Sequence, residues 1–136
     1  IDHPESVGLL VSLGKAWESL GDHKKQKNFL TRALKIFEKH HGKDHPDIGM
    51  TLKHLAFVWG ATKEFEKQKD ALSQAHKIYE RHYGSDHLEA GIILAELGDA
   101  WASLENYKKQ IETLKLHCIS LKNAMEAIIL KLVKYS

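Results

Sequence analysis

The sequence predicts an all-α solenoid built from helix-turn-helix repeats. Selected residues recur every 42 positions, and a fixed period between about 20 and 50 residues is typical of a repeat array. Apolar residues within each period are spaced by three and four, which indicates amphipathic helices. No run alternates apolar and polar residues as a half-buried strand would. The recurring residues include His3, His45 and His87; Trp17, Trp59 and Trp101; Leu30, Leu72 and Leu114; and Gln26, Gln68 and Gln110.

Each period is expected to hold two helices, and the second period shows this most completely. Residues 47–61 and 65–82 both carry apolar residues at helical spacing. Pro46 suits the first turn of the first helix, where a missing N–H costs little, and Asp47 suits the positive end of its dipole. Gly42 and Gly84 are placed to end the second helices, while Gly21 is placed in the turn between helices.

These signals divide the chain into consecutive units. We expect a first repeat at residues 1–42, a second at 43–84 and a third at 85–122, followed by a C-terminal helix at 123–136. Each unit stacks on its neighbour, because a single helical pair cannot bury its apolar face alone. The sequence starts at a repeat boundary, which suggests a piece cut from a longer array.

The repeated positions resemble a known family. Leu13-Gly14, Trp17, Gly21, Leu30 and Ala33 match the pattern of the tetratricopeptide repeat, and the pattern recurs in phase in the next two units. The 42-residue period and the Asp-His-Pro loop are similar to the kinesin-light-chain type of this repeat. The resemblance covers residues 1 to about 122. It implies a right-handed superhelix whose first helices line a concave groove.

Two features differ from the family pattern. Gln26, Gln68 and Gln110 stand where alanine is usual, and so long a side chain is expected to turn outward or to loosen the helix pair. Kinesin light chains that bind cargo often carry asparagines just before the Leu-Ala of the first helix. Those slots hold Val11-Ser12, Lys53-His54 and Ala95-Glu96 here, so the peptide specificity of the light chains is not carried over.

The resemblance implies a set of residues that face the groove. Phe57 is expected to anchor a partner, since an exposed aromatic is a frequent hot spot of binding. Small residues beside it would leave room for a side chain of the partner. The charged groove positions include both lysines and acidic residues. The alternative is a solvated face without a binding role. The groove positions are Val11, Lys15, Glu18, Ser19, Met50, Lys53, Phe57, Gly60, Ala61, Ile92, Ala95, Asp99, Ala102 and Ser103.

The tryptophans and histidines have structural explanations. Tryptophans at one repeat phase beside leucine are expected to pack in the core. Histidines crowd the loops near residues 40–45 and 82–87, where capping or packing explains them better than a zinc site, which needs three or four convergent ligands. His117 occupies the slot of Ala33 and Ala75, so we expect a partly polar pocket or a distorted third unit.

Other functions are disfavoured by what the sequence contains. Cys118 and His117 are adjacent on a helix and so point in different directions, which makes a poor catalytic dyad, and no phosphate-binding glycine loop or zinc-protease motif is present. The formal charge of +2 gives no basis for binding nucleic acid. The sequence shows no membrane span, and a single cysteine favours a reducing, cytoplasmic location. We expect no enzyme activity, cofactor or metal.

The C-terminal stretch 123–136 breaks the repeat phase and is apolar around most of its circumference. It is expected to begin a fourth unit, to fold back over the third repeat, to continue the preceding helix from Tyr107, or to contact another molecule. A contact through Ile128, Ile129, Leu132 and Val133, such as a symmetric homodimer, is the preferred hypothesis.

The sequence therefore predicts a non-catalytic scaffold or adaptor that binds a peptide or helix of a partner protein in its groove. The alternative is a self-assembly module that contacts its copies through the repeat ends and the C-terminal helix.

Overall fold

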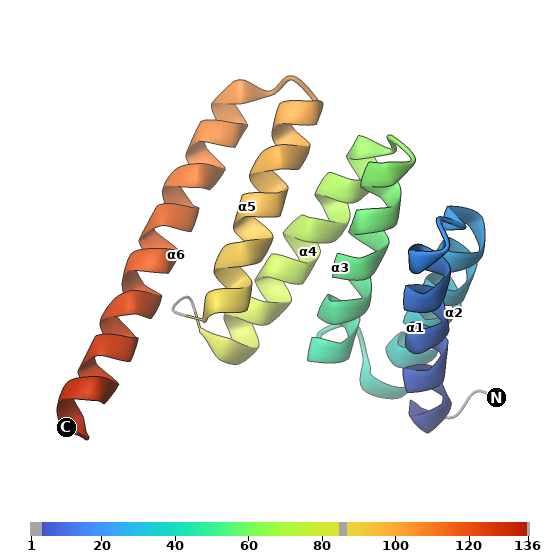
Figure 1. The fold of residues 1–136 in the computed structure, drawn as a ribbon, viewed down its shortest axis with the longest axis horizontal. Coiled ribbons are helices and arrows are strands. Elements are labelled where there is room, and N and C mark those ends of the chain that lie inside the picture. Colours follow the sequence, from blue (N-terminus) through green and yellow to red (C-terminus); the bar gives the residue numbers. More distant parts are fainter. Residues whose placement is uncertain (1–3, 85–86, 136) are drawn as a thin grey trace.

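The computed structural model describes residues 4–84 and 87–135, and in the first helix it describes the side chains of Leu9 and of Ser12 onward. The described residues form six α-helices and no strand: α1 (Pro4–Ser19), α2 (His23–His41), α3 (Pro46–Ala61), α4 (Phe65–Tyr83), α5 (Leu88–Ser103) and α6 (Tyr107–Lys134). Each helix packs on the next one along the chain, and the antiparallel pairs stand side by side in a row (Figure 1). The predicted all-α solenoid is confirmed.

Local signals begin the helices where the sequence places them. The Nδ1 atom of His45 accepts a hydrogen bond from the backbone N–H of Asp47 at 3.1 Å, and Pro46 occupies the first helical position of α3. His87 caps α5 in the same way, through the N–H of Glu89 at 3.2 Å. The repeated Asp-His-Pro loop is therefore a helix-capping device. Its first copy, which includes His3, lies outside the described residues.

The turns inside the three pairs share one backbone conformation. Gly21 has a φ of 75°, and the residues 42 and 84 positions later, Lys63 and Glu105, have φ values of 64° and 59°. A left-handed conformation is strained for residues that carry a Cβ. The pairs therefore keep the same turn even where glycine is absent.

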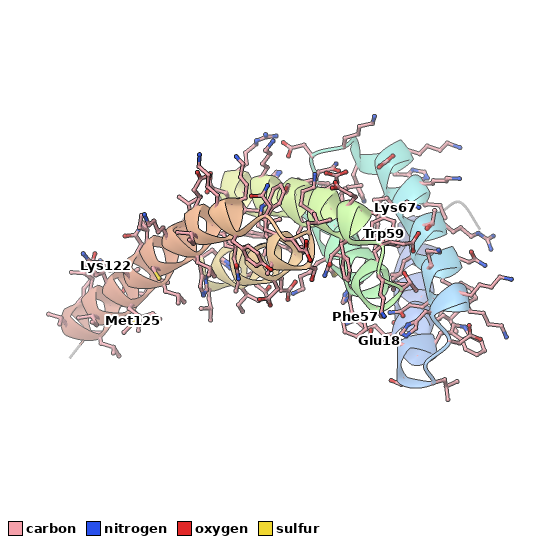
Figure 2. All side chains as sticks on the ribbon, turned by 90° about the horizontal axis from the view of Figure 1, so that it is seen from above. Glu18, Phe57, Trp59, Lys67, Lys122 and Met125 are labelled. Carbon is pink, nitrogen blue, oxygen red and sulfur yellow. The ribbon has the colours of Figure 1, made fainter. Side chains whose placement is uncertain are left out.

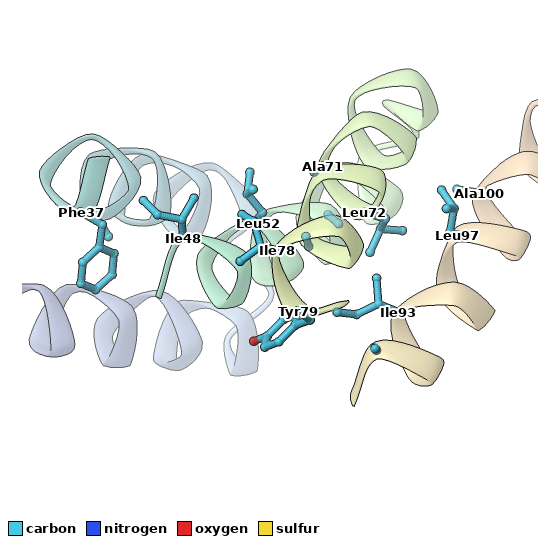
Figure 3. Close-up of a cluster of buried hydrophobic side chains, with 14 of the residues drawn as sticks. Phe37, Ile48, Leu52, Ala71, Leu72, Ile78, Tyr79, Ile93, Leu97 and Ala100 are labelled. Carbon is cyan, nitrogen blue, oxygen red and sulfur yellow. The ribbon is translucent and has the colours of Figure 1, made fainter. Parts of the chain in front are cut away.

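The core runs through the row of helices rather than forming one centre. One cluster of buried residues extends from Phe37 and Ile48 through Leu72 and Tyr79 to Ile93 and Ala100 (Figure 3). Leu30, Leu55 and Val58 form a second cluster at the junction of α2 and α3. Trp59 and Trp101 are half-buried and pack against the first cluster, as expected for core residues. Trp17 is also half-buried, and the Lys25 ammonium lies 4.2 Å from the centre of its ring.

The expectation for the repeated glutamines is wrong for Gln26. Its side chain turns inward and is fully buried, and Nε2 donates a hydrogen bond to Oε2 of Glu18 at 3.1 Å. In the second pair, Gly60 stands where Glu18 is, and a Cβ there would lie 2.6 Å from Nε2 of Gln68. The pair stays closely packed because the residue opposite the glutamine either bonds to it or gives it space.

The C-terminal stretch is part of α6, which runs for 28 residues from Tyr107 to Lys134. Of the arrangements expected for residues 123–136, the structure shows the one in which they continue the helix that begins at Tyr107. It extends well past α5 (Figure 1), and His117 lies half-buried with Nδ1 3.7 Å from where a Cβ of Gly91 would be. The third pair therefore tolerates histidine in an alanine slot because glycine faces it. Across the described residues, no helix combines the length and the apolar character that crossing a membrane requires.

Candidate functional site: the groove of the first helices

A groove of about 720 Å³ lies along one side of the solenoid, where α1, α3 and α5 follow one another. Figure 2 shows Glu18 and Phe57 on this side and Lys67 on the opposite one. The first helix of each pair, α1, α3 and α5, lines the groove. Side chains of α4 form part of its floor. The lining residues are Lys15, Glu18, Ser19, Lys53, His54, Ala56, Phe57, Gly60, Ala61, Phe65, Gln68, Leu72, Glu96, Asp99 and Ser103.

Most of the groove positions expected from the sequence line this groove. Nine of them are brought together there: Lys15, Glu18, Ser19, Lys53, Phe57, Gly60, Ala61, Asp99 and Ser103. Met50, Ile92, Ala95 and Ala102 lie off its lining, and the side chain of Val11 lies outside the described residues. Whether any of these residues binds a partner stays a prediction.

Sequence reasoning missed six lining residues. His54 and Glu96 are 42 positions apart and directly follow two predicted groove positions, so the repeat phase contained a signal for both. Phe65, Gln68 and Leu72 lie on α4, and no pattern within one helix shows that a second helix reaches the floor. The buried Ala56 completes the set.

Phe57 is the main apolar feature of the groove, with 53% of its surface exposed on a helix whose other large apolar residues are mostly buried. Gly60 and Ala61 follow it one turn later, and their small size leaves open space beside the ring. An exposed ring beside small residues leaves room for an apolar side chain of another molecule to pack against it.

Charges of both signs face the groove. Lys53 reaches from α3 to α5, where its ammonium lies 2.9 Å from a carboxylate oxygen of Glu89. Burial, together with the nearby Lys15 and Lys53, lowers the pKa of His54 and so favours the neutral form of the ring. Burial raises the pKa of Glu96 on the facing helix, an effect that Lys53 opposes.

The polar side chains of Glu18 and Gln68 in the groove differ in their hydrogen bonding. Glu18 is held by the buried Gln26, so its carboxylate is fixed at the groove's edge. Oε1 of Gln68 is buried and accepts no hydrogen bond from the described residues.

The loop before α3 holds a cluster of possible metal ligands, but its geometry does not suit an ion. The imidazoles of His41 and His45 stack with centroids 4.2 Å apart and planes inclined by 17°, and Asp47 lies beside them. Nitrogen lone pairs lie in the ring planes, so two nearly parallel rings do not aim at one point. In the next loop, Tyr83 stacks on His87 in the same manner, and its ring carries no imidazole nitrogen. The cluster is a stacked aromatic cap.

The four predicted contact residues on the C-terminal part of α6, Ile128, Ile129, Leu132 and Val133, are all exposed. They share this property with Ile111, Leu116, Ile119 and Met125 on the same helix. An apolar surface of this extent is unusual for a helix that faces only water.

Comparisons with known proteins agree with this geometry. Residues 8–47 match the family model described as tetratricopeptide repeat. No curated protein matches the sequence to a significant degree.

Solved structures share the fold. BtubC (BKLC) from P. vanneervenii is similar with a TM-score of 0.83 and 17% identity, over 89% of this chain and 48% of that one. A protein from Podosopora anserina, described as a kinesin light chain with nearly identical TPR-like repeats, gives a TM-score of 0.75 and 18% identity, over 88% of this chain and 57% of that one. The chain thus spans about half the length of the structures it matches.

Residues 8–47 thus match a tetratricopeptide repeat, and the described helices form an all-α solenoid that shares the fold of these structures. The row of helix pairs is similar in fold to the TPR-like repeats of the Podosopora anserina protein.

Proposed function

We propose that the groove binds a peptide or a helix of a partner protein, so that the chain serves as a scaffold or adaptor. Tetratricopeptide repeats are generally protein-interaction modules and typically non-catalytic. The observation that carries the proposal is the exposed Phe57 ring at the centre of the groove, with small residues beside it and hydrogen-bonding groups around it.

The groove offers each kind of contact that a peptide needs. Phe57 provides apolar area, and Lys15, Lys53 and Asp99 provide charges along the edges. Mixed charge favours a peptide that carries both signs around an apolar residue.

Peptides selected from a random library on the intact protein test this proposal. We expect Phe57→Ala and Ala61→Leu each to weaken binding of the selected peptides by about tenfold or more, the first by removing the anchor and the second by filling the space beside it. Tyr107→Ala is the matched control, because Tyr107 is an equally exposed aromatic residue that does not line the groove. Fluorescence anisotropy gives the affinities, and circular dichroism checks the helix content. Unchanged affinity in both groove variants would refute the proposal.

Self-assembly is the second candidate function. The exposed apolar residues along α6 favour it, because they are more numerous than those on the outer faces of α2 and α4.

A further inference from the structure

A hollow of about 370 Å³ lies between α2 and α4, at the first junction, where the first helix pair meets the second. Figure 2 shows Trp59 and Lys67, which both line the hollow, on the side of the solenoid opposite Phe57 and the groove. Trp59 of α3 also packs against both buried clusters. All the lining residues belong to α2, α3 and α4, so the hollow is formed within the row of helices and not at either end of it.

Positive charge dominates the lining of this hollow. Four of its seven lining residues are cations and none is acidic: the cations are Lys27, Arg32, Lys35 and Lys67, and the others are Asn28, Thr31 and Trp59. The amide of Asn28 and the hydroxyl of Thr31 add hydrogen-bond donors. A lining of this kind attracts an anion and repels a cation.

Only part of this positive charge is neutralised by the described residues. Glu64, which lies outside the lining, pairs with Lys67 at 3.2 Å and with Lys27 at 3.6 Å. Arg32 and Lys35 are exposed, and neither forms an ion pair or a side-chain hydrogen bond with any residue that the structure describes. The hollow therefore keeps two positive charges for a ligand.

The equivalent positions 42 residues later, at the second junction, show what a lysine in this place binds. Lys69 is the equivalent of Lys27, and its ammonium lies 2.8 Å from a carboxylate oxygen of Asp70 and 3.1 Å from one of Glu66. The same ammonium lies 5.2 Å from the centre of the Trp101 ring. At the second junction the chain itself thus supplies two carboxylates to a lysine beside the repeated tryptophan.

The first junction has neither of these carboxylates. Asn28 stands in the place of Asp70, and Lys24 stands in the place of Glu66. A further cation, Arg32, replaces a neutral glutamine. The first junction therefore keeps the lysine and the tryptophan of the second but exchanges its carboxylates for an amide and a cation. Carboxylates that come from another molecule would offset this charge.

We propose that the hollow binds an acidic segment of a partner protein, whose aspartate or glutamate side chains supply the carboxylates that the first junction lacks. One carboxylate pairs with Lys27 beside Trp59, as Asp70 pairs with Lys69 at the second junction. A volume near the lower end of the roughly 300–1,000 Å³ of ligand pockets suits a short segment rather than a folded element.

Arg32 and its neighbours on α2 provide the second contact. The guanidinium is planar and binds a carboxylate through two parallel hydrogen bonds, and Lys35 lies one turn further along the same helix. The proposal favours a protein over a nucleic acid, because the equivalent lysine is bound by carboxylates. This inference is independent of peptide binding in the groove.

Fluorescence anisotropy with two labelled peptides tests the inference. One peptide carries four consecutive glutamates, and the other carries four glutamines in their place. We expect the glutamate peptide to bind the intact protein about tenfold or more tightly than the glutamine peptide, because two ion pairs are lost with the carboxylates. Its affinity should fall as salt is added, since the pairs lie near the surface.

Variants that convert the first junction into the second locate the site. Asn28→Asp/Arg32→Gln gives the hollow two residue types of the second junction and should weaken binding of the glutamate peptide by about tenfold. Gln74→Glu/Lys77→Gln is the matched control, because it lowers the net charge by the same two units at exposed positions of α4 outside the hollow. This control and Phe57→Ala should bind like the wild type. Circular dichroism checks that each variant is folded.

Four results would overturn the inference. Equal binding of the two peptides, or binding of neither, would show that the hollow does not select carboxylates. Equal losses in the two double variants would assign binding to the net charge of the chain, and a loss in Phe57→Ala would assign it to the groove. Displacement of the glutamate peptide by single-stranded DNA at a lower concentration than by unlabelled peptide would assign the hollow to nucleic acid.

Discussion

The ammonium of Lys53 on α3 lies 2.9 Å from a carboxylate oxygen of Glu89 on α5 and so joins the first helices of two consecutive pairs. The ion pair thus links two of the helices that line the groove. The side chains are 25% and 41% exposed, so the pair is partly shielded from solvent.

A double-mutant cycle of Lys53→Ala and Glu89→Ala measures this pair. We expect a coupling free energy of about 0.5–1 kcal/mol, at the upper end for surface ion pairs because of the partial burial. The coupling should weaken in 1 M salt, where the Debye length is only about 3 Å. Urea unfolding gives the free energies. The more exposed pair Lys109 and Glu112 within α6 serves as the control and should show weaker coupling.

His54 should make the stability of the fold depend on pH. Its pKa in the folded protein lies below its ordinary value, because burial and the nearby lysines disfavour the charged ring. Above about pH 6.5 the ring is neutral in both states and this contribution to stability is fully present. As the pH falls below that value, the unfolded chain binds a proton first, and stability is lost down to the folded pKa.

The variant His54→Gln should therefore lose less stability than the wild type between pH 7.5 and pH 5, as measured by urea unfolding at both values. His76, whose pKa burial also lowers, is unchanged in the comparison and contributes equally to both proteins. Equal losses in the two proteins would contradict the assignment.

Leu72 and Leu114 occupy the same repeat position but differ in burial. Leu72→Ala should reduce the free energy of unfolding by about 3–5 kcal/mol, because it leaves a cavity in a fully buried site. Leu114→Ala should cost roughly half as much, since part of that side chain is already in water. Thermal or urea unfolding at low protein concentration compares the two, and equal costs would argue against the difference in burial.

The ring of His45 caps α3 by accepting the N–H of Asp47. His45→Ala should cost about 0.5–2 kcal/mol, the range found for removing a side-chain cap. His45→Asn should recover most of this loss, because asparagine accepts the same kind of hydrogen bond. Unfolding of both variants and of Lys43→Ala, an exposed neighbour, checks the expectation. A fully destabilised asparagine variant would mean that ring stacking on His41 matters more than the cap.

Lys63 has a φ of 64°, a conformation that glycine adopts without strain. Lys63→Gly should stabilise the protein by about 0.5–1 kcal/mol, since the relief of roughly 1–2 kcal/mol of strain exceeds the added freedom of the unfolded chain. Thr62→Gly is the contrasting change. Thr62 has a φ of −91° and its hydroxyl donates to the backbone oxygen of Val58, so glycine there should destabilise. A stabilising effect at both positions would point to a different cause.

The sequence alone determined the first five helices and their order, but it left open whether residues 123–136 continue the helix that begins at Tyr107. These follow from local chemistry: apolar spacing selects the buried face of a helix, Pro46 and His45 begin α3, and Gly42 and Gly84 end the helices before them. The 42-residue period determined that like pairs stack in series, because the same buried positions recur in each. Nine residues that line the groove were among those that the resemblance to the tetratricopeptide repeat implied.

Only the tertiary structure decided how side chains from different helices meet. Gln26 is buried because Glu18 on another helix offers it a hydrogen bond, and Gln68 fits because Gly60 leaves it space, and neither relation is a property of one segment. The α4 residues in the groove floor and the uncovered Leu114 likewise depend on which helix lies beside which. Periodicity fixes the face that a helix buries, but the distance and tilt between helices set what each side chain touches.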